Sequence, residues 1–158
     1  AIIKRTEAEL LRHASSSNVE LVQLGGAEFA GVEDASVDFI FSYDVQLHLQ
    51  PQNNFAYLLD AKRILRPGGV MMLHQINLAS PGGMGHFREQ FGTGTWRRSF
   101  GSLGRIGHIY YSSRDQMTAL AAEAGLKEVS FVDVFPQPGH PLSGVNNGRD
   151  LVGFYTPS

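Results

Sequence analysis

The sequence of 158 residues predicts an α/β domain with a mostly parallel β-sheet that ends in an antiparallel hairpin. Apolar, strand-like runs alternate with helical patterns along most of the chain, which is typical of parallel strands joined by helices. The last two strand-like runs, 127–135 and 150–156, have no helical pattern between them and therefore predict the hairpin. The length suits one domain over residues 1–158 with a single hydrophobic core.

The first predicted element is a helix that carries Ile2, Ile3, Leu10 and Leu11 on one apolar face and ends at the polar run 15–18. The run "VELVQL", residues 19–24, then predicts a strand that Gly25 and Gly26 stop. "VDFIFS", residues 37–42, is almost continuously apolar and predicts a strand that helices bury on both faces.

A second helix is expected from about Pro51 to Leu65, with proline near its start and "RPGG", residues 66–69, as its stop. We interpret the two glycines of that stop as turn residues. "GVMMLHQINL", residues 69–78, then predicts another buried strand.

Residues 79–111 interrupt this rhythm, because eight of the 18 glycines of the chain lie there among scattered aromatic residues and arginines. We expect an irregular insertion. It is either a lid over a bound small molecule, with Trp96, Arg97 and Tyr110 as contacts, or a variable surface excursion whose aromatic residues pack on the sheet. After it, Ser113 is expected to cap a helix that Gly125 ends.

The composition excludes several kinds of function. With 42% hydrophobic and 18% charged residues, the chain is that of an ordinary globular protein, and its net charge of −2 gives no general attraction to nucleic acid or to an anionic membrane. The sequence lacks cysteine, and its six histidines show no metal-binding spacing, so we expect no metal site. Because no signal peptide or membrane-spanning run is visible, we expect a cytoplasmic protein.

Three stretches together resemble a class I S-adenosylmethionine-dependent methyltransferase domain. They are "DASVDFIFSYDVQLHL", "LLDAKRILRPGGVMMLHQINL" and "MTALAAEAGLKEVSFVDVF", and the "RILRPGG" segment between a helix and a buried strand is the most specific of their features. The resemblance implies a Rossmann-like fold, S-adenosylmethionine as the cofactor and methyl transfer as the activity. It covers nearly the whole chain apart from the insertion.

The chain departs from this family at its start, where neither the glycine-rich loop after the first strand nor the acidic residue after the second strand is present. We therefore expect an incomplete, N-terminally truncated copy of the domain. The strand at residues 19–24 would then have an unpaired edge, which either a second chain covers in a homo-oligomer or the strand avoids by moving beside residues 37–42. The resemblance implies cofactor contacts near the ends of two strands, at Gly26, Ala27, Glu28, Phe29, Ser42 and Tyr43.

The segment after residue 42 lines the space between cofactor and acceptor in the resembling family. This implies acceptor contacts by Asp44 and His48, with His48 as the candidate base, and Gln75 and Asn77 are further candidates at the end of the next strand. Simpler roles stay open: Asp44 can cap the next turn, and His48 can bond a backbone carbonyl. His74 lies inside an apolar run and is more typical of a core histidine.

Two functions follow from these patterns. The first is S-adenosylmethionine-dependent methyl transfer to a small-molecule acceptor. The second is a methyltransferase-like module that has lost the cofactor site and binds a ligand or a partner chain. Upstream sequence with a glycine-rich loop would favour the enzyme.

Overall fold

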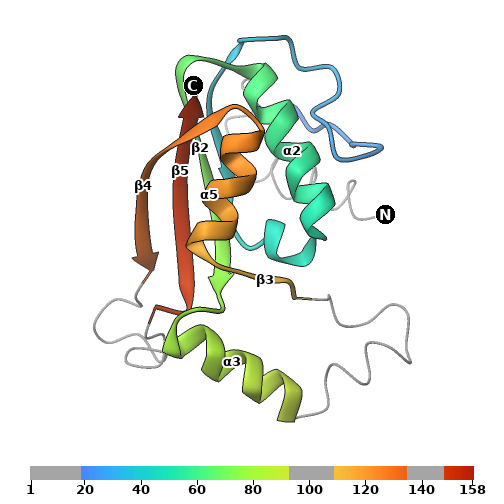
Figure 1. Ribbon diagram of the computed structural model, residues 1–158. Coiled ribbons are helices and arrows are strands. Elements are labelled where there is room, and N and C mark those ends of the chain that lie inside the picture. Colours follow the sequence, from blue (N-terminus) through green and yellow to red (C-terminus); the bar gives the residue numbers. More distant parts are fainter. Residues whose placement is uncertain (1–18, 93–108, 135–147) are drawn as a thin grey trace.

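The computed structural model describes residues 19–92, 109–134 and 148–158 (Figure 1). The helix expected near Ile2 lies outside these residues. The described elements are β1 (Val37–Ser42), the 3-10 helix η1 (Gln46–His48), α2 (Pro51–Ile64), β2 (Leu65–Asn77), α3 (Pro81–Gly92), β3 (Tyr111–Ser112), α5 (Arg114–Glu123), β4 (Leu126–Val134) and β5 (Asp150–Pro157).

The sheet has the strand order β1-β2-β5-β4, and the short strand β3 pairs with the end of β2. β1 and β3 are parallel to β2, whereas β5 is antiparallel to both β2 and β4. β4 and β5 therefore form the predicted antiparallel hairpin, with β5 inserted between β4 and the parallel strands. The prediction of an α/β fold with a mostly parallel sheet is confirmed.

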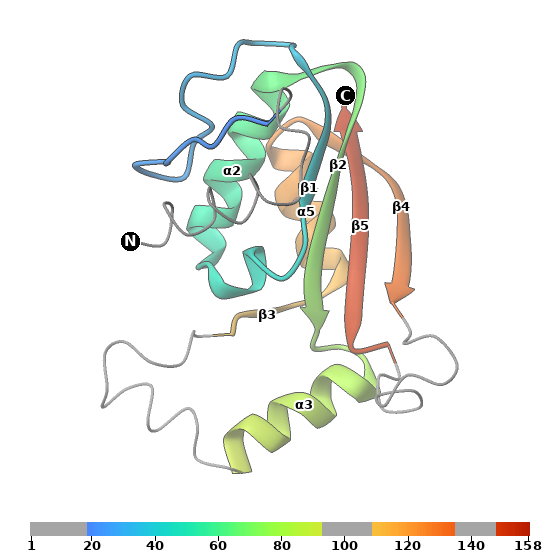
Figure 2. The same cartoon turned by 180° about the vertical axis from the view of Figure 1, so that it is seen from behind.

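The core lies on one face of this sheet, beneath α2 and α5. Its central row contains Ile40, Met71 and Tyr155, which are paired in register across β1, β2 and β5, and Leu58 and Met117 of the two helices pack on them. Figure 2, seen from the other side, shows the strands with neither helix in front of them. Burial of large apolar side chains is the main stabilising contribution to such a core, at about 2 kcal/mol for each.

The "RPGG" turn lies within β2 and bulges from the pairing with β1. Val37 pairs with Leu65 and Phe39 pairs with Val70, so β1 advances by two residues while β2 advances by five. Gly68 adopts a φ of +81°, which favours glycine. The helix stop read from the sequence is therefore also the bulge that sets the register of the two strands.

α5 has the ends that the sequence predicts. The Ser113 hydroxyl accepts a hydrogen bond from the Gln116 amide at 3.2 Å, and the Gln116 side chain accepts one from the Ser113 amide at 3.0 Å, which completes a capping box. Gly125 follows the helix with a φ of +78°.

Two expectations about strands were wrong. Residues 19–24 form no strand, and Val19 and Val22 are more than half exposed, because no neighbouring strand satisfies their backbone groups in the described chain. β1 is not buried on both faces, since Phe39 and Phe41 are 52% and 66% exposed on the face without helices.

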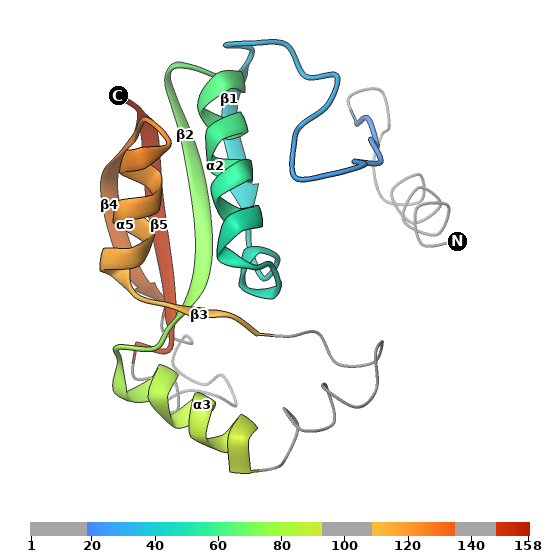
Figure 3. The same cartoon turned by 45° about the vertical axis from the view of Figure 1, so that its right-hand side comes forward.

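The expected irregular insertion, 79–111, contains the helix α3, and the pairing of β3 begins at its last residue. α3 lies beyond the end of β2 (Figures 1 and 3). A Cβ atom at Gly83 would overlap the Asn77 carbonyl, so glycine allows the start of α3 to pack closely on the strand end. None of the described helices is both long and apolar enough to cross a membrane.

Candidate functional site

A polar cavity of about 370 Å³ lies where β1 and β2 end and β5 begins. Because β1 and β2 are parallel, their carboxyl ends meet at the same edge of the sheet, the usual position of ligand sites in open α/β sheets. The lining residues come from these strand ends, η1, α3 and the segments next to β3 and β5: Tyr43, Asp44, Leu47, His48, His74, Ile76, His86, Ile109, Arg149 and Asp150.

The backbone turns sharply at Asp44, directly after β1. Asp44 has a φ of +59°, a conformation that aspartate tolerates better than most residues. Its amide donates a hydrogen bond to Nδ1 of His74 at 3.1 Å. The Tyr43 ring stacks on the same imidazole, with 4.2 Å between ring centroids. The end of β1 is therefore attached to the buried histidine of β2.

Neighbouring groups orient the buried ring of His74. Nδ1 accepts a hydrogen bond from the Asp44 amide, and Nε2 lies 3.4 Å from Oδ1 of Asp150. The distance is long and Nε2 makes no well-aligned hydrogen bond in the described structure, so Asp150 orients this ring by charge more than by a short bond. The hydrogen bond at Nδ1 and the burial of the ring make His74 a structural group, as its apolar run indicates.

Asp150 is a nearly buried carboxylate whose charge is balanced by its neighbour. Arg149 donates two hydrogen bonds to it, from Nε at 3.0 Å and from Nη2 at 2.7 Å. This pairing is the main reason that the pKa of Arg149 is raised. Burial and then the charges of Asp150 and Asp44 raise the pKa of Tyr43, so its phenol stays protonated and can donate a hydrogen bond.

The polar cavity also contains the imidazole of His86, from α3, which is half-buried. Its Nδ1 lies 2.9 Å from the hydroxyl oxygen of Tyr111. Burial, and then the positive charge of Arg149, lower the pKa of His86, so this ring is neutral at pH 7. If Nδ1 carries the hydrogen and donates it to Tyr111, Nε2 has the lone pair that a base needs, and the Gln90 side-chain nitrogen lies 3.5 Å from it as a weak donor that an acceptor molecule would have to displace.

The sequence analysis did not single out His86, Arg149 or Asp150. His86 lies in a glycine-rich stretch without recognisable spacing, and Arg149 and Asp150 lie at a predicted loop–strand junction. The available signal was a charged pair at the start of a strand that is otherwise apolar.

The predicted acceptor residues are divided between two cavities. Asp44 and His48 line the polar cavity, together with Tyr43 from the predicted cofactor set. Gln75 and Tyr110 line a second cavity on the helix-covered face. Asn77 accepts a hydrogen bond from the Ala79 amide through its side chain, which holds the turn into α3.

Trp96 and Arg97 lie outside the described residues, so their predicted contacts with the acceptor stay predictions. The described residues contain no group of three side chains that could hold a metal ion.

The predicted cofactor residues are also in separate places. Gly26 accepts a hydrogen bond from the Tyr57 hydroxyl, and the Phe29 ring packs at 5.5 Å from that of Tyr57, so this segment lies against α2. Ser42 is buried in β1, and Tyr43 lies at its end. Neither cavity includes Gly26, Ala27, Glu28 or Phe29 in its lining. Of the predicted cofactor residues, these two cavities take in Tyr43 alone.

Residues 3–73 match the family described as methyltransferase domain. No curated protein matches the sequence. Among solved structures, the chain is similar to the CcbJ methyltransferase from Streptomyces caelestis, with a TM-score of 0.64 and 15% identity over 99% of this chain and 71% of that one.

Two further solved structures are similar. A possible histamine N-methyltransferase from Thermotoga maritima gives a TM-score of 0.61 and 19% identity over 87% of this chain and 64% of that one. The 1,6-didemethyltoxoflavin-N1-methyltransferase from Burkholderia thailandensis gives a TM-score of 0.62 and 16% identity over 97% of this chain and 56% of that one. The chain thus spans between 56% and 71% of these three chains. Residues 3–73 thus match the methyltransferase-domain family, and the chain as a whole shares its fold with these methyltransferases.

Proposed function

We propose that this chain contributes the acceptor-binding part of an S-adenosylmethionine-dependent methyltransferase, and that the polar cavity binds a small-molecule acceptor. The observation that carries the proposal is the convergence of Tyr43, Asp44, His48 and His86 at the carboxyl ends of parallel strands. The Burkholderia structure is named for a complex with a small methyl acceptor and S-adenosylhomocysteine, which agrees with an acceptor of this size.

The cavity favours an acceptor with N–H or O–H groups. Asp150 is balanced by Arg149, which leaves Asp44 as an exposed carboxylate at the rim. The Tyr43 hydroxyl can donate a hydrogen bond to an oxygen or ring nitrogen of the methyl acceptor. The Asp44 carboxylate can accept a hydrogen bond from an N–H or O–H group of the same molecule. This pairing selects a small polar amine, alcohol or nitrogen heterocycle.

The role of the protein in the transfer is to place the acceptor atom and to receive its proton. In-line placement supplies most of the rate in such reactions, and a base matters when the acceptor atom carries a hydrogen that it must lose. His48, from the sequence, and His86, from the structure, are the candidate bases. We favour His86, because its lowered pKa keeps it neutral and its ring is anchored by Tyr111.

The first test is calorimetric titration of this chain with S-adenosylhomocysteine, which requires no knowledge of the acceptor. A dissociation constant in the micromolar range supports the proposal. Absence of binding would show that this chain is not a catalytic unit by itself, and it would favour the non-catalytic binding module.

The second test is radiolabelled methyl transfer to a pool of small amines, alcohols and heterocycles. We expect His86→Gln to lower the rate about 100-fold while S-adenosylhomocysteine binding is unchanged. Asp115→Asn, an exposed change on α5, is the matched control. An equal rate for His86→Gln and the control would remove His86 as the base, and a loss with His48→Gln alone would assign that role to His48.

A further inference from the structure

The guanidinium of Arg149 is held along one edge by Asp150. Nε donates a hydrogen bond to Oδ1 of Asp150 at 3.0 Å, and Nη2 donates one to Oδ2 at 2.7 Å, so the two planar groups pair through two bonds. Asp150 is only 4% exposed and is the first residue of β5, which ties the pair to the sheet. The orientation of the guanidinium is therefore fixed before any ligand binds.

The second edge of this guanidinium, formed by Nη1 and Nη2, keeps its hydrogen-bond donors. A guanidinium has five N–H groups in one plane, and Asp150 takes one from Nε and one from Nη2. The other N–H of Nη2 and both N–H groups of Nη1 have no partner among the described residues. One hydrogen of Nη1 and one of Nη2 point in the same direction along this edge, and their spacing matches the two oxygens of a carboxylate.

Arg149 is part of the wall of the polar cavity. It lines the cavity, and its side chain is 32% exposed. Burial, and then the positive charge of Arg149, lower the pKa of His86 on α3. The same charge opposes the rise in the pKa of Tyr43 that burial and two carboxylates produce. The guanidinium thus lies close to two side chains that we assign to the acceptor site.

The charges of the cavity favour a ligand that has both a carboxylate and an amine. Asp150 and Arg149 balance each other, and Asp44 adds an exposed carboxylate at the rim. A ligand with a carboxylate alone would add to the negative charge of Asp44. An ammonium group in the same molecule removes this conflict, because Asp44 can accept its hydrogen bonds.

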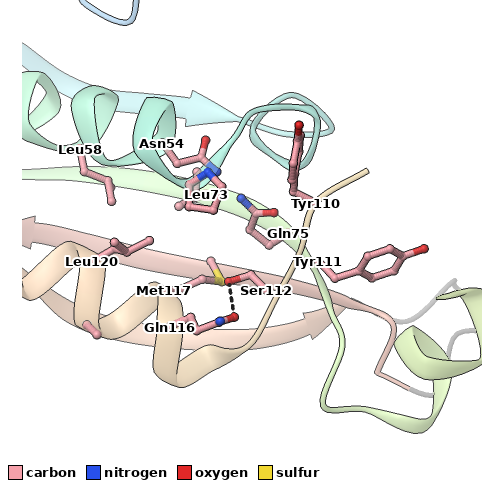
Figure 4. Close-up of a pocket in the computed structure, with 12 residues that line it drawn as sticks. Asn54, Leu58, Leu73, Gln75, Tyr110, Tyr111, Ser112, Gln116, Met117 and Leu120 are labelled. Carbon is pink, nitrogen blue, oxygen red and sulfur yellow. Dashed lines mark hydrogen bonds between the residues drawn. The ribbon is translucent and has the colours of Figure 1, made fainter. Parts of the chain in front are cut away.

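The second cavity, of about 290 Å³, has no such charges. Figure 4 shows its lining, with Leu58 and Leu120 near one end and Tyr110 and Tyr111 near the other. None of its described lining residues is acidic, basic or a histidine. A carboxylate has no charged partner there, so of these two cavities only the polar one suits such a ligand.

We propose that Arg149 is a specificity-determining residue of the polar cavity, which binds a carboxylate of the methyl acceptor through its Nη1–Nη2 edge. The acceptor is then a small amino acid or a related amine that carries a carboxylate. This inference rests on the proposed function for the statement that the ligand is a methyl acceptor. The recognition of the carboxylate rests on the Arg149–Asp150 pair alone.

The test compares two probes that differ only at the carboxylate. They are 4-(aminomethyl)benzoate and 4-(aminomethyl)benzamide, which share the ring and the amine. We would label the isoleucine methyl groups and follow each titration by NMR. Ile76 and Ile109 line the polar cavity, whereas Ile40 and Ile64 lie in the core outside its lining, so the first pair reports binding and the second pair position.

The benzoate should shift the Ile76 and Ile109 signals saturably and bind about tenfold or more tightly than the benzamide, the scale of a charge-assisted hydrogen bond. Arg149→Lys keeps a positive charge beside Asp150 but lacks the second edge. It should weaken benzoate binding by about tenfold and change benzamide binding by less than about twofold. The retained benzamide affinity shows that the variant cavity is folded.

Two further variants act as controls. Arg114→Lys changes an exposed arginine that pairs with Glu128, away from the cavity, and should leave both affinities unchanged. Asp44→Asn should weaken both probes by a similar factor, because both carry the amine, and should leave their ratio unchanged. Asparagine tolerates the positive φ of this position.

Three outcomes would overturn the proposal: no shift with either probe, equal affinity for the two probes, or an unchanged ratio of affinities in Arg149→Lys. Should Arg149→Lys melt at a lower temperature and bind neither probe, the comparison of the two probes in the parent chain decides. No methyl donor is present in these titrations, so they are independent of catalysis. Preference for the benzoate in a chain that does not bind S-adenosylhomocysteine would support the carboxylate site and contradict the proposed function. Methyl transfer by a chain without this preference would do the reverse.

Discussion

The imidazole Nε2 of His74 lies 3.4 Å from Oδ1 of Asp150, with both side chains almost fully buried. These residues are far apart in the sequence and adjacent in space because β5 pairs with β2, with His74 opposite Val152. Among the described strands, β5 is the only antiparallel neighbour of β2, and the His74–Asp150 pair links these two strands. His74 also contacts the end of β1, through the Asp44 amide. It therefore stabilises the edge of the sheet that forms the polar cavity.

Asp150→Asn should destabilise the fold by about 2 kcal/mol, because Arg149 and His74 lose a buried negative partner. Urea unfolding followed by circular dichroism measures this change. Asp38→Asn is the matched control, since it breaks the exposed ion pair with Arg66 and should change stability little. Equal losses of stability from the two substitutions would mean that the buried carboxylate of Asp150 stabilises the fold no more than the exposed carboxylate of Asp38 does.

Stability should fall as the pH is lowered through the region below about 6.5, the ordinary pKa of histidine. The folded pKa of His86 is lowered by burial, so at these pH values the unfolded chain binds its proton more strongly than the folded chain. The loss of stability that comes from His86 stops growing once the pH is below the pKa of His86 in the folded chain.

The measurement is unfolding at a series of pH values, in the parent and in His86→Gln. The variant should show a shallower pH dependence in this window, and NMR titration of the His86 ring should give a pKa below 6.5. A ring pKa above that value would contradict the prediction.

Ser113→Ala should cost about 1 kcal/mol of stability, because it removes one half of the capping box at the start of α5. Ser130→Ala, an exposed change on β4, is the control and should have a smaller effect. Thermal unfolding of the three proteins compares them directly. If the two alanine variants melt together, the capping interaction does not support α5.

The chain should associate at high concentration through β1 and the sheet face that carries Phe39 and Phe41, because both rings are more than half exposed. Phe41→Lys should weaken association by tenfold or more in sedimentation velocity experiments, since it places a charge on that face. Leu59→Lys, at an exposed leucine of α2, should leave association unchanged. A parent chain that stays monomeric at all concentrations would rule this interface out.

Much of the secondary structure could be read from the sequence, because its signals are local. The apolar run 37–42, the proline at Pro51 and the Ser113 cap each depend on residues within a few positions of one another. Strand formation at 19–24 could not be decided in this way, since an alternating pattern becomes a strand only when a second strand accepts its hydrogen bonds. The helix over Pro81–Gly92 was hidden by its glycines, of which Gly83 is needed for contact with Asn77.

The sequence by itself determined the α/β class, the hairpin and the strand end at which Asp44 and His48 line a cavity. Only the tertiary structure decided which residues share a site. Alternation along β2 sends His74 and Gln75 to opposite faces, and the pairing of β5 brings Asp150 to His74. Neighbours in the sequence are thus separated by the sheet while distant residues meet across it, because strand pairing is a long-range choice that no local pattern records.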